Sequence, residues 1–326
     1  MDVSVIIVNY CTADLVIDCI NSVFNKTSGV TYEIIVVDNA SGDDSVSRLQ
    51  SVFGEKIRLI PSTENLGFGK GNNLGVKFAS GKYLFLLNPD TYLLNNAIKV
   101  LADFLDVNPR VGVAGGNLFF PDESPAPSFC REFDMPHQEV ICSRWKEILG
   151  GRLKKKLGMR EKEPFSKEFN HSAKPIPVAY IFGADMMVRH DLFLKLNGFD
   201  PEFFMYAEEE ELSWRICKAG YEIVSIPEAR IVHLEGAATQ SDGGFNERQF
   251  RMRMNGKLVY YRKCFGQEGM ETFYSARMRR YKRLMALAKL RGRDPKASQA
   301  SVMLECLEDE YSKSKMSLLS SEIKYG

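Results

Sequence analysis

The sequence contains no long hydrophobic run, no paired-cysteine motif and almost no net charge. No apolar stretch approaches the roughly 20 residues that a membrane-spanning helix needs, and Met1 and Asp2 lead directly into a strand-like run without the basic segment of a secretory signal. The seven cysteines include no C-x-x-C pair, which fits reduced thiols better than a disulfide framework or a zinc site. We therefore expect a folded cytoplasmic protein that is not secreted and does not cross a membrane by itself.

The charge is balanced overall but uneven along the chain. The 43 Lys and Arg residues and the 42 Asp and Glu residues give a formal net charge of +1, so no broad positive field favours nucleic acid. Basic residues gather at positions 152–160 and 277–293, and acids gather at positions 208–211. Any electrostatic attraction must therefore come from local patches, and we expect no nucleic-acid partner.

The first third of the chain alternates short apolar runs with amphipathic segments. The predicted strands are Val3–Val8, Glu33–Val37, Ile57–Ile60, Tyr83–Leu87 and Val111–Gly115, and the predicted helices are Asp14–Phe24, Asp43–Phe53, Gly69–Ala79 and Asn95–Leu105. Strands joined by helical crossovers predict an α/β protein with a mostly parallel, doubly wound sheet. Such sheets bind ligands at the carboxyl ends of their strands. This rule places Asn9, Tyr10, Asp38, Asn39 and Asn88–Thr91 along one rim.

The rest of the chain is less regular. Prolines interrupt the pattern from Pro121 to Pro177, which we interpret as an insertion or a segment that covers a substrate. Regular elements are then predicted at Val178–Val188, Asp191–Leu196, Glu209–Ala219, Glu222–Ile226 and Arg230–His233. After about residue 240 the chain is predicted to be helical and basic, with a mixed, peripheral segment at Ser298–Gly326.

One predicted strand ends abruptly in Asn88-Pro89-Asp90. A carboxylate at this place can bind a divalent cation that bridges a diphosphate, because Mg²⁺ is typically held by one or two carboxylates together with phosphate oxygens. The same residues also suit a turn that merely ends the strand. Taken alone, the pattern leaves both interpretations open for Asp90.

Two further segments suit a nucleotide. Asp38 follows a buried strand, where an acid can bind ribose hydroxyls or a base edge, although it can equally cap the next helix. The glycine-spaced turn at residues 64–73 opens a helix whose N–H groups can face a phosphate. Its glycines match neither a P-loop nor G-x-G-x-x-G, so no NAD-dependent enzyme is predicted.

Four glutamates, Glu208–Glu211, open a predicted helix directly after the apolar segment Phe203–Tyr206. Acids in a first turn are favoured by the helix dipole, so a solvated face is the usual interpretation. A carboxylate beside so apolar a segment can instead have the raised pKa that a general base needs. His233 ends a strand, and only the company of Asp90 would make it a second metal ligand rather than a structural residue.

The order of these segments resembles glycosyltransferase family 2, in particular the rhamnosyltransferase-like branch that builds bacterial surface polysaccharides. The matching segments are Val5–Tyr10, Val36–Ser41, Glu64–Asn73, Leu86–Thr91, Gly198–Tyr206, Ala219–Tyr221, Val232-His233 and Tyr260–Lys263. Each segment is modest evidence, whereas the ordered set covers roughly residues 3–266.

The resemblance implies a GT-A fold (the nucleotide-diphospho-sugar transferase fold) with C-terminal helices, and inverting transfer of a sugar to an acceptor hydroxyl. It implies that Asp38 binds the nucleobase, that Asp90 is the last residue of the metal-binding D-x-D element, and that His233 helps to hold Mg²⁺ or Mn²⁺. The family's acidic pair falls on Glu208 and Glu209, whose second member is the catalytic base. The donor-binding residues would be Asn9, Tyr10, Asp38, Asn39, Asn65, Gly67, Asn73, Asn88 and Asp90.

The same resemblance suggests a division of the chain and a set of partners. Residues 1–120 would bind the nucleotide sugar, residues 121–240 would bind the acceptor and carry the base, and residues 241–326 would form a helical, basic C-terminal region. The donor would be dTDP-rhamnose or a UDP-sugar, and the acceptor a glycan or a polyprenyl-linked sugar. A lipid-linked acceptor favours peripheral contact with the inner face of the cell membrane, through residues 145–157 or 275–293, although both segments also suit solvated helices.

Two departures from the family pattern keep other functions open. The D-x-D element is Asn88-Pro89-Asp90, which leaves one carboxylate for the metal, and the base position carries Glu instead of Asp. A non-catalytic sugar- or nucleotide-binding protein on the same fold is therefore one alternative. A sugar nucleotidyltransferase is another, but it should carry a glycine-rich, basic phosphate loop after the first strand, where this chain has Asn9-Tyr10-Cys11-Thr12.

Overall fold

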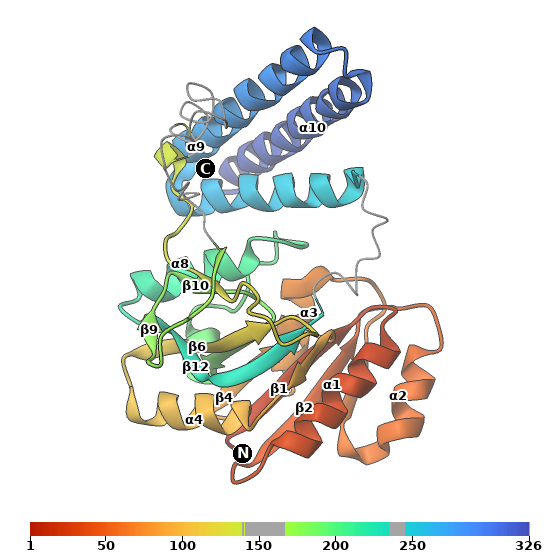
Figure 1. Ribbon diagram of the computed structural model, residues 1–326, viewed down its shortest axis with the longest axis vertical. Helices are drawn as coiled ribbons and strands as arrows, with labels where there is room; N and C mark the ends of the chain where they lie inside the picture. Colours follow the sequence, from red (N-terminus) through yellow and green to blue (C-terminus); the bar gives the residue numbers. More distant parts are fainter. Residues whose placement is uncertain (139, 141–166, 235–244, 326) are drawn as a thin grey trace. The chain divides into compact units, whose positions relative to one another are not determined.

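The computed structural model describes residues 1–138, 140, 167–234 and 245–325. The chain divides into two compact units (Figure 1). We call Met1–Phe133, Lys167–Phe204 and Glu208–Gln240 the sheet unit, and Asp134–Ser166, Met205–Ala207 and Ser241–Gly326 the helical unit. The basic segment at residues 145–160 lies outside the described residues.

The sheet unit is built on a nine-stranded sheet, in the order β3-β2-β1-β4-β11-β6-β12-β5, with β9 paired to β12. Its strands are β1 (Val3–Asn9), β2 (Tyr32–Asp38), β3 (Arg58–Pro61), β4 (Tyr83–Leu87), β5 (Thr91–Leu93), β6 (Val111–Phe119), β9 (Ile176–Pro177), β11 (Asp185–Arg189) and β12 (Glu222–His233). The central strands are buried apolar runs because helices cover both faces of the sheet.

The first part of the sheet is parallel, as predicted, and the rest is mixed. β1 pairs in parallel with β2 and β4, whereas β11 runs antiparallel between β4 and β6. The two strands predicted at Glu222–Ile226 and Arg230–His233 are one strand, β12, whose register against β6 shifts between Ser225 and Arg230. β5 was not predicted, because three residues after a turn carry too little pattern to recognise.

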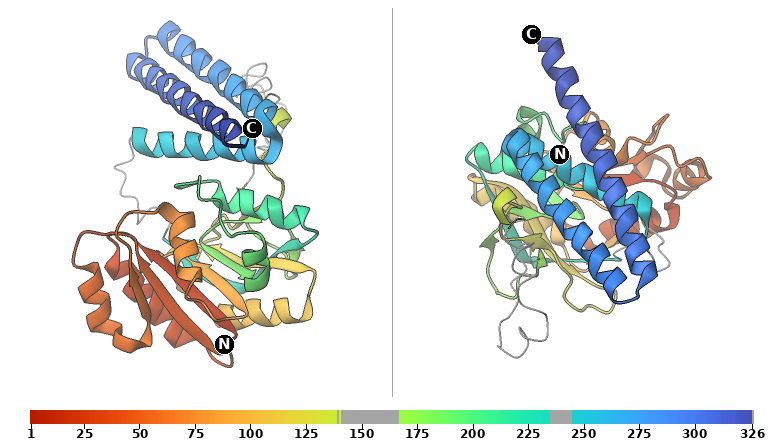
Figure 2. Two further views of the ribbon diagram at one scale, coloured as in Figure 1. Left: turned by 180° about the vertical axis from the view of Figure 1, so that it is seen from behind. Right: turned by 90° about the horizontal axis from the view of Figure 1, so that it is seen from above.

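Helices cover the two faces of this sheet (Figures 1 and 2). One face packs against α1 (Ala13–Lys26), α2 (Ser45–Phe53) and α4 (Ala97–Val107), and the other against α3 (Gly67–Val76), α7 (His190–Lys195) and α8 (Glu208–Lys218). A 3-10 turn, η1 (Gly54–Lys56), follows α2. Three short strands, β7 (Phe129–Cys130), β8 (Lys167–Glu168) and β10 (Tyr180–Ile181), form a second small sheet in the order β10-β7-β8.

The described part of the helical unit consists mainly of two long helices. α9 (Glu247–Leu290) kinks at Gly266, whose backbone is left-handed, and α10 (Asp294–Tyr325) folds back along it (Figure 2). The rings of Tyr274 and Tyr311 stack between these helices, with centroids 3.9 Å apart. The expectation of mixed structure at Ser298–Gly326 was wrong, since α10 runs through it and buries Leu304, Cys306 and Leu307. Within the described residues, no helix combines the length and apolarity needed to cross a membrane.

Candidate functional site

The site begins where β1 and β2 end side by side. Asn9 and Asp38 are paired in the parallel register, and Asn9 Nδ2 donates a hydrogen bond to Asp38 Oδ1 at 2.7 Å. The Ser41 hydroxyl donates to the same oxygen at 2.6 Å, and the Ser41 amide donates to Asp38 Oδ2 at 3.2 Å. Asp38 is 3% exposed, so these bonds hold a buried carboxylate at the carboxyl rim of the sheet. Tyr10, the next residue after Asn9, is 47% exposed beside it.

Backbone with positive φ angles follows β1 and β2 and precedes α8. Cys11 and Ala40, which follow β1 and β2, have φ angles of 56° and 59°, and Tyr206 and Ala207, which precede α8, have φ angles of 73° and 70°. A residue with a side chain is uncommon in this left-handed region, and such strain concentrates at functional sites. In the part of the chain that the structure describes, four of the six non-glycine residues with positive φ therefore adjoin segments that the sequence marks for chemistry.

Asp90 and His233 meet at the end of β12. β12 pairs with β5 so that His233 lies opposite Thr91, and the amide of Leu234 donates to the Asp90 carbonyl at 2.9 Å. This pairing brings His233 Nε2 to 3.3 Å from Asp90 Oδ1, with the two side chains 18% and 5% exposed. The structure thus places His233 beside Asp90, which is the condition under which His233 would be a second metal ligand.

The Asp90–His233 pair suits a divalent cation as part of a larger coordination shell. A carboxylate oxygen and an imidazole nitrogen within hydrogen-bond distance of each other can both contact one ion. Among the described residues, no group of three or more His, Cys, Asp or Glu side chains is placed to hold a metal. The remaining positions would therefore have to be filled by phosphate oxygens and water, as is usual for Mg²⁺.

A second polar network holds the segment before α3. Asn39 Oδ1 accepts from the amide of Leu66 at 2.8 Å, and Asn39 Nδ2 donates to Asn65 Oδ1 and to the Gly67 carbonyl. Gly67 has φ of 76°, and a Cβ there would lie 1.9 Å from the carbonyl oxygen of Phe204. Only glycine fits such a position, so the backbone at Gly67 approaches that of Phe204 closely.

The start of α3 also lies against the start of α8. A Cβ on Gly69 would lie 3.8 Å from the Cβ of Glu208, and the amide of Phe68 donates to the Phe204 carbonyl at 3.0 Å. Further along α3, the Asn73 carboxamide donates to the Phe199 carbonyl at 2.7 Å and accepts from its amide at 3.0 Å. Both ends of Asn73 are thereby used to position the 199–204 loop. α3 therefore links the Asn39 network to the glutamates.

The first two glutamates of α8 differ in environment. Glu208 is 3% exposed, and its Oε2 has no hydrogen-bond partner among the described residues, whereas Glu209 is half-buried. Burial, together with the neighbouring charge of Glu209, raises the pKa of Glu208 well above the ordinary value for glutamate. Burial thus favours the protonated form of Glu208 more than that of an ordinary glutamate.

The rest of α8 is fixed by an ion pair. Arg215 forms a two-pronged salt bridge with Glu211, at 2.7 Å for each contact, and also donates to the carbonyls of Leu196 and Gly198. Glu211 thus has a structural partner one turn along the helix.

Two polar residues at the rim were not predicted as site residues. Ser41 belongs to the Asp38 network, and its signal was its position three residues after Asp38. Asp185 is fully buried in β11, where it accepts from the Gly116 amide at 2.6 Å, and burial raises its pKa well above the ordinary value. A single acid within the apolar run at residues 184–188 was the available signal.

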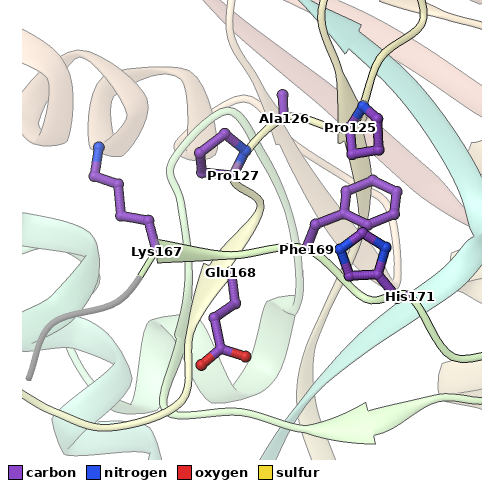
Figure 3. Close-up of a pocket in the computed structure, with 7 residues that line it drawn as sticks. All are labelled: Pro125, Ala126, Pro127, Lys167, Glu168, Phe169 and His171. Atoms are coloured by element: carbon purple, nitrogen blue, oxygen red, sulfur yellow. The ribbon is translucent and has the colours of Figure 1, made fainter. Parts of the chain in front are cut away.

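A cavity of about 330 Å³ lies near the end of β6 (Figure 3). It is lined by Pro125, Ala126, Pro127, Lys167, Glu168, Phe169 and His171. In Figure 3 the rings of Pro125, Phe169 and His171 lie close together, while Lys167 and Glu168 point in different directions. The Phe169 ring packs edge-on against Phe119, 5.3 Å away, and Phe119 pairs with Val232, the residue before His233. The cavity therefore lies beside β6, the strand that pairs with β12 just before His233.

Comparison with solved structures identifies the class of fold. The structure aligns with GalNAc-T7, solved with UDP, GalNAc and Mn²⁺, at a TM-score of 0.59 and 16% identity, over 84% of this chain and 50% of that one. It also aligns with the mannosyltransferase PcManGT from Pyrobaculum calidifontis, solved with GDP-Man and Mn²⁺, at a TM-score of 0.53 and 16% identity, over 96% of this chain and 86% of that one. These alignments confirm the GT-A fold.

The sequence comparisons place the chain within that class. The profile of glycosyl transferase family 2 matches residues 4–196, and the profile described as the N-terminal domain of galactosyltransferase matches residues 163–236. The chain belongs to glycosyl transferase family 2, as the resemblance implied.

The chain is also similar to curated members of the rhamnosyltransferase-like branch. It is 27% identical to the N-acetylglucosaminyl-diphospho-decaprenol L-rhamnosyltransferase of Mycobacterium tuberculosis, over 64% of this chain and 68% of that one. It is 24% identical to the dTDP-rhamnosyl transferase RfbF of Shigella flexneri, over 70% of this chain and 68% of that one.

Proposed function

We propose that the protein is an inverting, metal-dependent glycosyltransferase that moves a sugar from a nucleoside diphosphate to an acceptor hydroxyl. The observation that carries the proposal is the meeting of Asp90 and His233 at 3.3 Å, on the rim that also holds Asp38. These residues are far apart in the sequence, and the fold has no structural need to bury an acid beside an imidazole there.

In this proposal the rim binds the nucleotide. Asp38, held by Asn9 and Ser41, accepts from the nucleobase, and Asn39 and Asn65 keep the 64–67 turn in place beside it. Tyr10 and Asn88 adjoin the donor, Gly67 allows close approach of the backbone, and Asn73 acts through the loop that it positions.

Asp90 and His233 would hold a divalent metal ion, with the donor's phosphates completing its coordination. A bound Mg²⁺ or Mn²⁺ neutralises charge on the diphosphate and so makes it a better leaving group. A site with one carboxylate and one imidazole carries one negative charge fewer than a site with two carboxylates. Its affinity for the ion should therefore depend strongly on the donor's phosphates.

Glu209 acts as the catalytic base. It removes the proton from the acceptor hydroxyl while the acceptor oxygen attacks the anomeric carbon on the face opposite the diphosphate, which leaves with the bonding electrons. Glu208 is less suited to take this proton, because it is only 3% exposed and its pKa is raised by burial. The half-buried Glu209 next to it is the carboxylate that an acceptor can reach.

For the donor we propose dTDP-rhamnose, with UDP-sugars as the second choice, and for the acceptor a glycan or a polyprenyl-linked sugar of cell-surface polysaccharide synthesis. The name of the Shigella relative, a dTDP-rhamnosyl transferase, supports the donor. The name of the Mycobacterium relative supports both rhamnose transfer and a polyprenyl-linked acceptor. Because those matches are 27% and 24% identical, the branch, and not the particular sugar, is what they support most strongly.

The cavity beside β6 is our candidate for the acceptor sugar, within the 121–240 half. Its aromatic ring at Phe169 and its polar groups at His171 and Lys167 are the types that bind sugars. Phe169→Ala should raise the KM for acceptor severalfold and leave the slow, acceptor-free hydrolysis of donor unchanged. An equal loss of both activities would contradict an acceptor role.

The decisive experiment screens purified protein against dTDP-rhamnose, UDP-glucose, UDP-GlcNAc and GDP-mannose, each with Mn²⁺ and with EDTA. We expect one donor to raise the melting temperature only with metal, and the same donor to release nucleoside diphosphate. A metal-dependent thermal shift without any release, even with acceptor-containing membranes, would favour the non-catalytic binding protein. Release of pyrophosphate from a nucleoside triphosphate and a sugar phosphate would favour the nucleotidyltransferase.

A further inference from the structure

The helical unit exposes three leucines where α9 ends. Leu284 and Leu287 are each 46% exposed and Leu290 is 83% exposed. The same part of α9 buries Tyr281 and Ala288, so its packing face is already in use. The leucines therefore form a second apolar face that no described residue covers.

The turn between α9 and α10, where the two helices meet in Figure 2, has a strongly basic sequence. Between residues 279 and 296 the chain carries eight Lys and Arg residues, all of them exposed, and a single acid, Asp294. The eight are Arg279, Arg280, Lys282, Arg283, Lys289, Arg291, Arg293 and Lys296. We call these residues together with the three leucines the hairpin tip.

Leucines and arginines of the hairpin tip share one side of α9. Arg280, Arg283, Leu284 and Leu287 are related by spacings of three or four residues (280/283, 280/284, 283/287 and 284/287), which place their side chains on the same face of α9. Apolar and positive groups are thus presented together rather than on opposite faces. Such a mixed face does not suit bulk water, because the leucines gain nothing there.

Two acids of α10 already have cationic partners. Asp309 forms an ion pair with Arg251 at 2.9 Å, and Glu310 pairs with Lys313 at 2.7 Å. The stacking of Tyr311 on Tyr274 fixes this part of α10 beside the middle of α9, away from its end. The hairpin tip itself carries eight cations against the single acid Asp294, so its own sequence leaves it strongly positive.

We infer that the hairpin tip binds the surface of an anionic lipid bilayer. Leucines beside Lys and Arg residues are the composition of interfacial helices, in which apolar side chains enter the headgroup boundary while cations meet lipid phosphates. A second copy of the chain fits poorly, because a symmetric contact would bring two sets of eight cations together. This inference deepens the proposed function, since a polyprenyl-linked acceptor lies in such a bilayer.

The test uses the full chain without donor, metal or acceptor, so that failure of transfer and failure of membrane binding are separate results. Protein is sedimented with vesicles of phosphatidylcholine alone, or of phosphatidylcholine mixed with phosphatidylglycerol. We expect binding to the mixed vesicles only, and weaker binding as salt is raised. Equal binding to both vesicles, or binding to neither, would overturn the inference.

Two variants separate the charge from the apolar contribution. Arg279→Gln, Arg280→Gln and Lys282→Gln together should weaken vesicle binding about a hundredfold, since each cation near an anionic surface contributes about fivefold. Leu284→Ser with Leu287→Ser should weaken it by about fivefold per leucine. The matched control is Leu194→Ser with Lys195→Gln in α7, where Leu194 is 57% exposed, and it should bind like the unaltered chain.

Two more measurements keep the result interpretable. All variants should retain the helical circular dichroism of the parent, because every substituted side chain is exposed. Sedimentation velocity should show the same mass for the parent and the Leu284→Ser, Leu287→Ser variant. A parent dimer that this variant dissociates would overturn the inference in favour of a second copy of the chain.

Discussion

The rim of the sheet unit and the hairpin tip of the helical unit use polar residues in opposite ways. At the rim, Asp38 and Glu208 are each 3% exposed and lie next to backbone in left-handed conformations. At the hairpin tip, every charged side chain is exposed and the backbone is regular helix up to Leu290.

The difference concerns preorganisation. A buried polar network is costly to assemble and holds its groups in one geometry, which suits chemistry at a single atom. An exposed set of flexible cations and leucines has many equivalent arrangements, which suits a fluid surface. Substitutions at the rim should therefore have large and specific effects, while single substitutions at the hairpin tip should have small and cumulative ones.

The largest effect is expected at the two adjacent glutamates. Glu209→Gln should lower kcat about 100- to 10,000-fold and leave donor affinity nearly unchanged, because the base acts on the acceptor proton. Glu208→Gln is the matched control and should stay within a few-fold of the parent, because Glu208 is buried and Glu209 is the carboxylate that the acceptor can reach. Measured kcat values in which Glu208→Gln is the inactive variant would move the base by one residue.

Gly67 tests how rigid the rim is. Gly67→Ala should lower the free energy of unfolding by about 3 kcal/mol or more, from left-handed strain plus the clash with the Phe204 carbonyl. Gly42→Ala, at φ of 73° but with nothing within 4 Å of the added Cβ, should cost only about 1 kcal/mol. Urea unfolding measures both, and equal losses would mean that the close approach to Phe204 contributes nothing.

His233 tests the metal pair. His233→Ala should weaken donor binding in Mn²⁺ at least tenfold, the loss seen when even an outer partner of a metal ligand is removed. Binding in EDTA should stay the same, because the nucleobase contacts at Asp38 are intact. Titration calorimetry in both conditions gives the comparison, and an equal loss with and without metal would show a structural role instead.

The smallest rim effect is expected at Asp185, and it depends on pH. Because the pKa of Asp185 is raised in the folded chain, its contribution to stability is complete below the unfolded-state pKa, which is near 3.8, and is lost as the pH rises toward the folded-state pKa. Asp185→Asn removes that loss and should raise the free energy of unfolding at pH 8 by about 1 kcal/mol or more, with little change near pH 3.5. Urea unfolding at the two pH values decides, and an equal change at both would contradict the assignment.

Much of the first half of the fold was predicted correctly from the local pattern of apolar and polar residues. β1, β2, β4 and the helices between them were predicted to within a few residues, because buried strands and amphipathic crossovers carry strong periodicity. β11 and α10 were harder to predict from the sequence. β11 joins the sheet antiparallel, and this direction depends on where the irregular segment before it leads the chain. α10 was predicted as mixed structure because its charges and small residues mask the apolar positions that pack on α9.

The sequence by itself determined the family, the parallel start of the sheet and the residue types at the ends of β1, β2 and β4, because each of these is written in short local segments. Only the tertiary structure decided that His233 would meet Asp90, that Asn73 would hold the Phe199 loop, and that Glu208 rather than Glu209 would be buried. Those outcomes depend on strand pairing and helix packing between segments more than 100 residues apart, and no local pattern encodes the distance between two such side chains.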